Sequence, residues 1–153
     1  MKDNKKITLW ERYLTKEIGI EFKACLYFFA ILFYYCMYRI LIGLTDASIL
    51  HMAEMIFLAY AIGYLQVFVL WNFDEAQKLK AKEIFGIILC TTIYTGICHL
   101  GKWFDRNIWV EAGFWFYVAF VYVCAFFVYK AKRQIDDKIM NDELAMFKAR
   151  PKV

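Results

Sequence analysis

The sequence predicts an all-α integral membrane protein that folds as a bundle of four transmembrane helices. Hydrophobic residues make up 62% of the 153-residue chain, against roughly 45–50% in a typical soluble domain. A soluble chain of this size buries about two-thirds of its surface on folding, which is too little to hide so many apolar side chains. The charged residues are also segregated, because four apolar stretches together contain a single formal charge, Arg39.

These four stretches are the predicted transmembrane spans, at residues 24–44, 55–73, 84–101 and 112–129. Each is long enough to cross the hydrocarbon layer, which takes roughly 17–25 helical residues. Their apolar character is continuous and lacks the alternation of barrel strands, which favours helices. We expect one membrane domain over residues 1–153, with polar segments at 1–23 and 130–153. No small-residue cleavage site follows the first span, so we expect it to be retained as an anchor.

The distribution of Lys and Arg predicts the orientation of the chain. The segments 1–23, 74–83 and 130–153 carry 16 basic residues, whereas the loops 45–54 and 102–111 carry two. Basic residues concentrate on the cytoplasmic side of a membrane protein, so we expect both termini and the loop 74–83 in the cytoplasm. Because topology accounts for the basic residues, the lipid bilayer is the first expected partner and no direct contact with nucleic acid is expected.

The N-terminal segment is predicted to form an amphipathic helix over residues 7–22 that leads into the first span. Its apolar residues recur every three or four positions, at Ile7, Trp10, Leu14, Ile18 and Phe22. Two interpretations remain open. The helix lies on the membrane surface, or its apolar face docks a cytoplasmic partner.

The C-terminal segment is predicted to continue the fourth span as one helix, because residues 114–150 contain neither Gly nor Pro. Such a helix would extend roughly 55 Å, well beyond the roughly 30 Å of the bilayer core. A short helix is marginally stable alone in water, so the apolar residues of this cytoplasmic extension need a covering surface. The candidates are the N-terminal helix, the loop 74–83, a second copy of the chain or a different protein. These apolar residues are Ile135, Ile139, Met140, Leu144 and Phe147.

Polar residues near the exterior side are predicted to meet in one layer, formed by Arg39, Glu54, His99 and Glu111. We expect Arg39 to reach outward to water or to pair with Glu54 or Glu111. The layer either ties the helix ends together or forms an exterior site for a peptide or a lipid headgroup. Three tryptophans nearby are expected in the aromatic belt at the membrane surface, namely Trp103, Trp109 and Trp115.

No sequence pattern indicates an enzyme, and we expect no catalytic, cofactor-binding or metal-binding residues. The two histidines, His51 and His99, fit no metalloprotease motif. The five cysteines fall within the spans without a CxxC pair and are expected to pack as small apolar side chains. No Asp, Glu or Lys lies in the middle of a span, which argues against a cation-coupled transporter. Within the bundle only Gln66 and three threonines, at 91, 92 and 95, are expected to hydrogen-bond across helices.

The chain resembles a family of small bacterial four-span membrane proteins, a domain of unknown function whose members are often encoded beside LytTR-type transcription regulators. The resemblance extends from about Glu21 to Phe147 and is based on five features: the four spans, the expected cytoplasmic position of both termini, Gln66, His99 and the tail sequence from Ile135 to Leu144. It implies a protein of the bacterial plasma membrane that holds a partner regulator at the membrane and prevents it from activating transcription.

The leading hypothesis is therefore a membrane-anchored inhibitor that binds and sequesters a cytoplasmic LytTR-type transcription regulator. The expected contacts lie on the two cytoplasmic helices, at Trp10, Leu14, Ile18, Ile135, Ile139 and Leu144. The first alternative is a small accessory subunit of a membrane transporter or exporter, which requires a polar path through the bundle. The second is a peptide-sensing or immunity protein, which would use the exterior polar layer.

Overall fold

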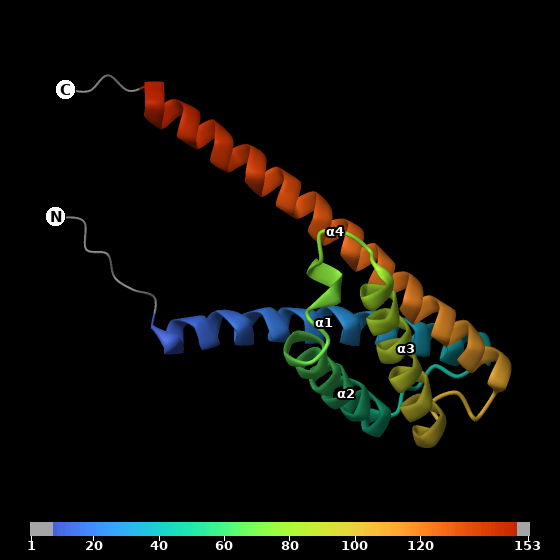
Figure 1. Cartoon of the computed structure of the whole chain (residues 1–153). Helices are drawn as coiled ribbons and strands as arrows, with labels where there is room; N and C mark the ends of the chain where they lie inside the picture. The colour runs from blue at the N-terminus through green and yellow to red at the C-terminus, as the bar shows by residue number, and fades with distance from the viewer. Residues whose placement is uncertain (1–7, 150–153) are drawn as a thin grey trace.

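The computed structural model describes residues 8–149, and the ends of the chain, including Ile7 and Arg150, lie outside the described residues. The described part of the chain folds into four α-helices and one short 3-10 helix. They are α1 (Leu9–Leu41), α2 (Ile49–Phe68), η1 (Phe73–Glu75), α3 (Ala81–Gly101) and α4 (Ile108–Ala149). Figure 1 shows their arrangement. All four α-helices are long and apolar enough to cross a membrane. The predicted all-α architecture with four candidate spans is confirmed.

Helix α1 joins the predicted N-terminal helix and the first predicted span into one element of 33 residues. Thr8 caps the start of the helix through two reciprocal hydrogen bonds with Glu11. The Thr8 N–H donates to the Glu11 carboxylate at 2.8 Å, and the Glu11 N–H donates to the Thr8 hydroxyl at 3.3 Å. The helix ends at Leu41, three residues before the predicted end of the span. The chain turns there at Gly43, whose φ of 80° suits glycine.

The second span differs from the prediction at both ends, because α2 covers Ile49–Phe68 rather than residues 55–73. Ser48 caps the start of the helix by accepting a hydrogen bond from the His51 N–H at 3.4 Å. The residues after Phe68 are apolar but not helical, and they fold back into the bundle through η1. Leu70 and Phe73 are buried there, so their apolar character reflects packing in a loop rather than an extension of the helix.

The loop between α3 and α4 also folds into the bundle, at the opposite end from η1. Its Trp103 and Phe104 are fully buried, and three of its residues adopt left-handed backbone conformations, Lys102, Asp105 and Arg106. The prediction of an aromatic-belt position for Trp103 is therefore wrong, because this side chain packs inside the bundle. Trp109, in contrast, is 88% exposed on the outer surface of the bundle.

Aromatic rings fill much of the core between the four helices. Tyr27 of α1 and Tyr122 of α4 pack with ring centroids 4.5 Å apart, and Tyr122 also lies 5.3 Å from the Phe73 ring of η1. Near the other end, the Phe104 ring lies 5.3 Å from Phe114. Aromatic pairs of this kind stabilise a core beyond the area that they bury. The high aromatic content of the sequence thus serves the interior as well as the lipid-facing surface.

Helix α4 is one continuous element of 42 residues, as the absence of Gly and Pro predicts. Its C-terminal part projects beyond the bundle, and the start of α1 and the end of α4 lie on the same side of the bundle (Figure 1). The N-terminal part of α1 points in a different direction from the C-terminal part of α4, so the two extensions diverge. From residue 134 to residue 149 every residue of this projecting segment, termed here the tail, is exposed.

Candidate functional site

A buried lysine on α1 lies at the centre of the most developed polar site in the described chain. Lys23 follows Ile20 and precedes Tyr27 on the inward face of the helix, at steps of three and four residues, and it is only 1% exposed. A charged side chain is costly to bury unless it is paired and hydrogen-bonded. The surroundings of Lys23 are therefore expected to supply both a countercharge and acceptors.

These acceptors come from the in-folded loop between α2 and α3. Trp71 and Asn72 both have positive φ, of 55° and 52°, and this reversal directs η1 back toward α1. Phe73 anchors the loop against α3, where a Cβ at Gly86 would lie 2.5 Å from the Phe73 ring. Glycine at position 86 is thus what allows Phe73 to pack so closely.

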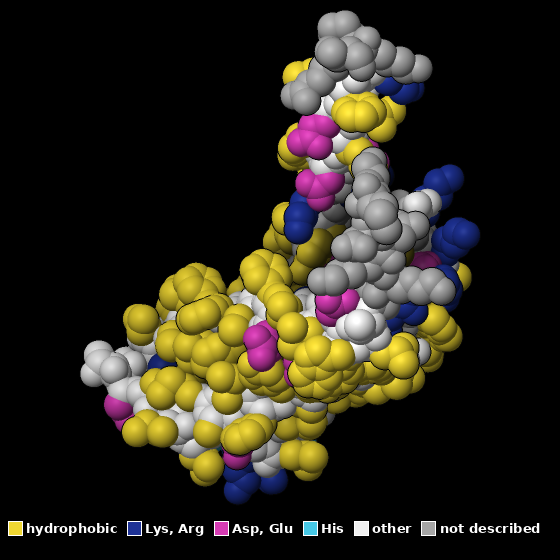
Figure 2. Space-filling view, turned by 90° about the vertical axis from the view of Figure 1, so that its left-hand side faces the viewer, with side chains coloured by type: hydrophobic (Ala, Val, Ile, Leu, Met, Phe, Trp, Pro, Cys, Tyr) yellow, Lys and Arg dark blue, Asp and Glu magenta, His cyan; other side chains and the backbone are white. Residues whose placement is uncertain are grey.

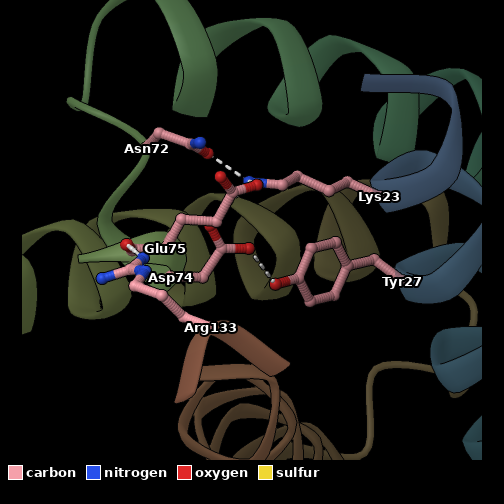
Figure 3. Close-up of polar contacts among 6 residues, drawn as sticks. All are labelled: Lys23, Tyr27, Asn72, Asp74, Glu75 and Arg133. Atoms are coloured by element: carbon pink, nitrogen blue, oxygen red, sulfur yellow. Dashed lines mark hydrogen bonds and ion pairs between the residues drawn. The ribbon is translucent and has the colours of Figure 1, made fainter. Parts of the chain in front are cut away.

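The loop surrounds the Lys23 ammonium with three acceptors (Figure 3). The ammonium pairs with Asp74 Oδ1 at 2.7 Å and with Glu75 Oε1 at 2.9 Å, and it donates to Asn72 Oδ1. The second oxygen of Asp74, Oδ2, accepts a hydrogen bond from the Tyr27 hydroxyl at 2.9 Å. Because an ammonium has three N–H donors, all of its donors are used.

Helix α4 joins the same site just before the tail begins. Arg133 donates to the backbone carbonyl of Glu75, and Figure 3 shows its side chain approaching η1 from α4. The Tyr129 ring, one turn earlier, lies 5.3 Å from the Lys23 ammonium, a distance at which a cation and an aromatic face attract. We call these contacts of Lys23, Tyr27, Asn72, Asp74, Glu75 and Arg133 the Lys23 network.

The Lys23 network connects three parts of the fold, namely α1, the loop with η1, and α4. Its carboxylate and ammonium groups are paired with each other, and its one hydroxyl, that of Tyr27, donates to Asp74. Within residues 8–149, no group of three or more His, Cys, Asp or Glu side chains could hold a metal ion. What the network can do is hold η1, the inward face of α1 and the base of the tail together.

The predicted exterior polar layer is divided into separate pairs. Arg39 pairs with Asp46 at 3.2 Å, and not with Glu54 or Glu111 as predicted. Glu54 accepts a hydrogen bond from the Trp103 indole N–H at 2.7 Å. His99 lies 2.9 Å from Glu111 through Nδ1. The four residues lie toward the same end of the bundle. Two of them, His99 and Glu111, contact each other, whereas Arg39 and Glu54 have partners outside the predicted layer.

The polar groups predicted to link helices inside the bundle mostly do not do so. The hydroxyls of Thr92 and Thr95 donate to the carbonyls of Ile88 and Thr91 in their own helix, at 2.7 and 3.0 Å. The exception is Thr92, which also accepts a bond from the Trp115 indole at 3.3 Å. Gln66 and Thr91 are fully buried, and their side-chain polar atoms have no partner among the described residues.

The predicted partner-binding residues are all exposed, and they lie on two surfaces. On the tail, Ile135, Ile139 and Leu144 are between 51% and 57% exposed. On α1, Trp10, Leu14 and Ile18 are likewise exposed. The two extensions diverge (Figure 1), so the tail is not covered by the N-terminal helix, one of the four candidate surfaces. Figure 2 shows a mixture of hydrophobic and charged side chains along the projecting part of the molecule.

The fold and these sites define a multi-pass helical membrane protein, with two in-folded loops and a long projecting helix. Comparisons with protein-family models, with curated proteins and with solved structures find no match to this chain. The functional argument therefore depends on the residues and the geometry described above.

Proposed function

We propose that this protein is a membrane-anchored inhibitor that binds a soluble cytoplasmic protein, a LytTR-type transcription regulator, and keeps it at the membrane. The observation that supports this proposal is the uncovered tail. Its apolar side chains are exposed on a helix that projects away from the bundle, and an apolar helix face of this kind is a common docking element for a partner protein. The regulator as the partner comes from the family resemblance.

The arrangement of residues around the tail supports a partner with a mixed surface. At about 100° per residue, the apolar residues occupy about half of the circumference, and the carboxylates of Asp136 and Glu143 lie inside that half. A complementary surface would be apolar and would carry basic groups. DNA-binding domains present such basic surfaces to phosphates, so a tail bound there would compete directly with DNA.

The exposed face of the N-terminal part of α1 is the second surface in this proposal. Trp10, Leu14 and Ile18 recur on one side of the helix and would either contact the regulator or lie in the membrane surface. Because α1 and α4 diverge, a partner bound to both would fill the space between the two extensions. A partner that binds the tail alone would be unaffected by changes at Trp10.

The experiment uses the full-length chain, purified in detergent together with a co-expressed LytTR-type regulator. Ile139→Glu places a charge in the apolar half of the tail and is expected to reduce co-purification at least tenfold. Asn141→Glu introduces the same side chain on the opposite half and is the matched control. Both positions are exposed, so neither change should affect folding. Equal co-purification of the wild type and Ile139→Glu would reject the tail as the docking surface.

No comparable observation favours the two alternatives. The exterior layer of a peptide-sensing protein would need Arg39, Glu54, His99 and Glu111 to act on one ligand, whereas they form separate pairs. A transport path would need polar groups along the bundle, and large aromatic side chains such as Tyr94 and Tyr122 fill its centre.

A further inference from the structure

A groove between α1 and α4 opens on the outer surface of the bundle. It encloses about 460 Å³, within the range of small-molecule sites. α1 contributes Phe22 and Leu26, and α4 contributes most of the remaining wall, including Phe120, Cys124 and Val128. These side chains are exposed in the isolated chain, so within a membrane they would contact acyl chains.

One end of this α1–α4 groove carries a positive charge. Val121, Ala125, Val128 and Lys132 follow one another at steps of four, three and four residues, so they lie on one stripe of α4, and all four line the groove. Lys132 is the only charged residue of its lining. Among the described residues Lys132 forms no ion pair, whereas Arg133, next to it, is engaged with η1.

We propose that the α1–α4 groove binds an anionic phospholipid, with one acyl chain along the apolar stripe and the phosphate on Lys132. The two parts of the site match the two parts of such a lipid. Basic pockets between transmembrane helices are suited to anionic headgroups, and the apolar wall excludes a polar ligand from the rest of the groove.

The carboxylates nearby determine on which side of Lys132 the phosphate binds. Asp136 lies one turn further along the tail. With Glu75, Tyr129, Arg133 and Lys132 itself, it lines a second, shallow hollow. Its negative charge would repel a phosphate there. The favourable position is therefore on the bundle side of Lys132, where the lining of the groove contains no carboxylate. This proposal is independent of the proposed function, because it requires no protein partner.

The test measures lipid retained by the full-length protein after purification from nanodiscs of equal parts dioleoylphosphatidylglycerol and dioleoylphosphatidylcholine. Native mass spectrometry gives the ratio of the two bound lipids. We expect the wild type to retain the phosphatidylglycerol preferentially. Lys132→Gln should reduce this preference about fivefold, the factor expected for the loss of one basic residue at the headgroup. Lys138→Gln, which removes a charge outside the groove lining, should leave it unchanged.

A second pair of variants tests the apolar part of the site. Cys124→Trp fills the groove and should reduce the retention of both lipids, whereas Cys25→Trp, an equally exposed cysteine outside the groove, should not. Monodisperse elution and unchanged helical content confirm that each variant is folded. Equal retention of both lipids by the wild type, or an unchanged preference in Lys132→Gln, overturns the proposal. If the wild type is a dimer and Cys124→Trp dissociates it, a second copy of the chain occupies the groove. This result would also overturn the lipid proposal.

Discussion

The Lys23–Asp74 pair offers a quantitative test of the buried network. In Lys23→Met, the Asp74 carboxylate, whose side chain has no exposed area, loses its counterion. The removal of one partner of a buried pair typically costs about 3–5 kcal/mol. In Asp74→Leu, the ammonium keeps Glu75 at 2.9 Å, so the loss should lie near the lower end of that range, about 3 kcal/mol.

The double variant Lys23→Met/Asp74→Leu should be at least as stable as either single variant. It leaves no unpaired charge between the two positions. Its remaining losses are the hydrogen bonds of the Tyr27 hydroxyl and the Asn72 amide, about 1 kcal/mol each, and the ion pair of the partly exposed Glu75 carboxylate, about 1 kcal/mol or less. The two single losses sum to about 6 kcal/mol or more, against about 3 kcal/mol for the double variant. The coupling free energy between the positions should therefore be about 3 kcal/mol or more.

The assay is reversible unfolding in mixed micelles with increasing sodium dodecyl sulfate, followed by far-ultraviolet circular dichroism. Lys16→Met is the matched control, because Lys16 is an exposed lysine two turns earlier on α1. Its ammonium lies 5.6 Å from the centre of the Phe68 ring, so its loss should change the free energy of unfolding by no more than about 1 kcal/mol. Additive losses in the double variant would mean that Lys23 and Asp74 do not interact, and the reasoning about the network would be refuted.

The same assay checks two close contacts elsewhere in the bundle. Gly86→Ala places a Cβ 2.5 Å from the Phe73 ring and should destabilise the fold by about 1–3 kcal/mol. In Gly96→Ala the new Cβ would meet no atom within 4 Å, so this variant should be neutral or more stable by up to about 1 kcal/mol. A similar loss of stability in both variants would contradict the packing described for η1. Trp103→Phe removes the hydrogen-bond donor to Glu54 and should lower the free energy of unfolding by about 1–3 kcal/mol, whereas Trp109→Phe should have little effect. A larger loss of stability in Trp109→Phe than in Trp103→Phe would show that Trp103 is not buried.

The number of helices and the unbroken tail were predictable, because both follow from local composition. Continuous apolar runs identify helices that can cross a membrane, and the lack of Gly and Pro explains the continuity of α4. The ends of the helices were not predictable in the same way. Two largely apolar segments, residues 69–73 and 103–104, raise the local hydropathy of the sequence as a transmembrane span does. In the structure they are loops that fold into the bundle, where Leu70, Phe73, Trp103 and Phe104 are buried. Composition does not distinguish side chains that face lipid from side chains that pack in a loop.

The Lys23 network was missed because its charged members lie in segments interpreted as polar and cytoplasmic, whereas Tyr27 and Asn72 lie in two different predicted spans. One signal was present: Lys23 lies on the apolar stripe that contains Ile20 and Tyr27, and a charge on such a stripe indicates a buried partner. Its partner, Asp74, could not be identified without the left-handed turn at Trp71 and Asn72. For the exterior layer, helix lengths predicted a common depth for Arg39 and Glu54, but their actual partners depend on the loop conformations.

The tail and the in-folded loop are mechanically linked, because both are held by the same network. Arg133 lies at the base of the tail and binds the Glu75 carbonyl, and the Glu75 carboxylate in turn binds Lys23. A hydrogen bond to a charged group contributes about 1.5–3 kcal/mol. Tilting the tail away from η1 would break the Arg133 contact at that cost, which is well below the free energy of micromolar binding, about 8 kcal/mol. A partner of ordinary affinity could therefore shift the direction of the tail. Such a shift would reach Lys23 by two routes, through the backbone and side chain of Glu75 and through the Tyr129 ring of α4.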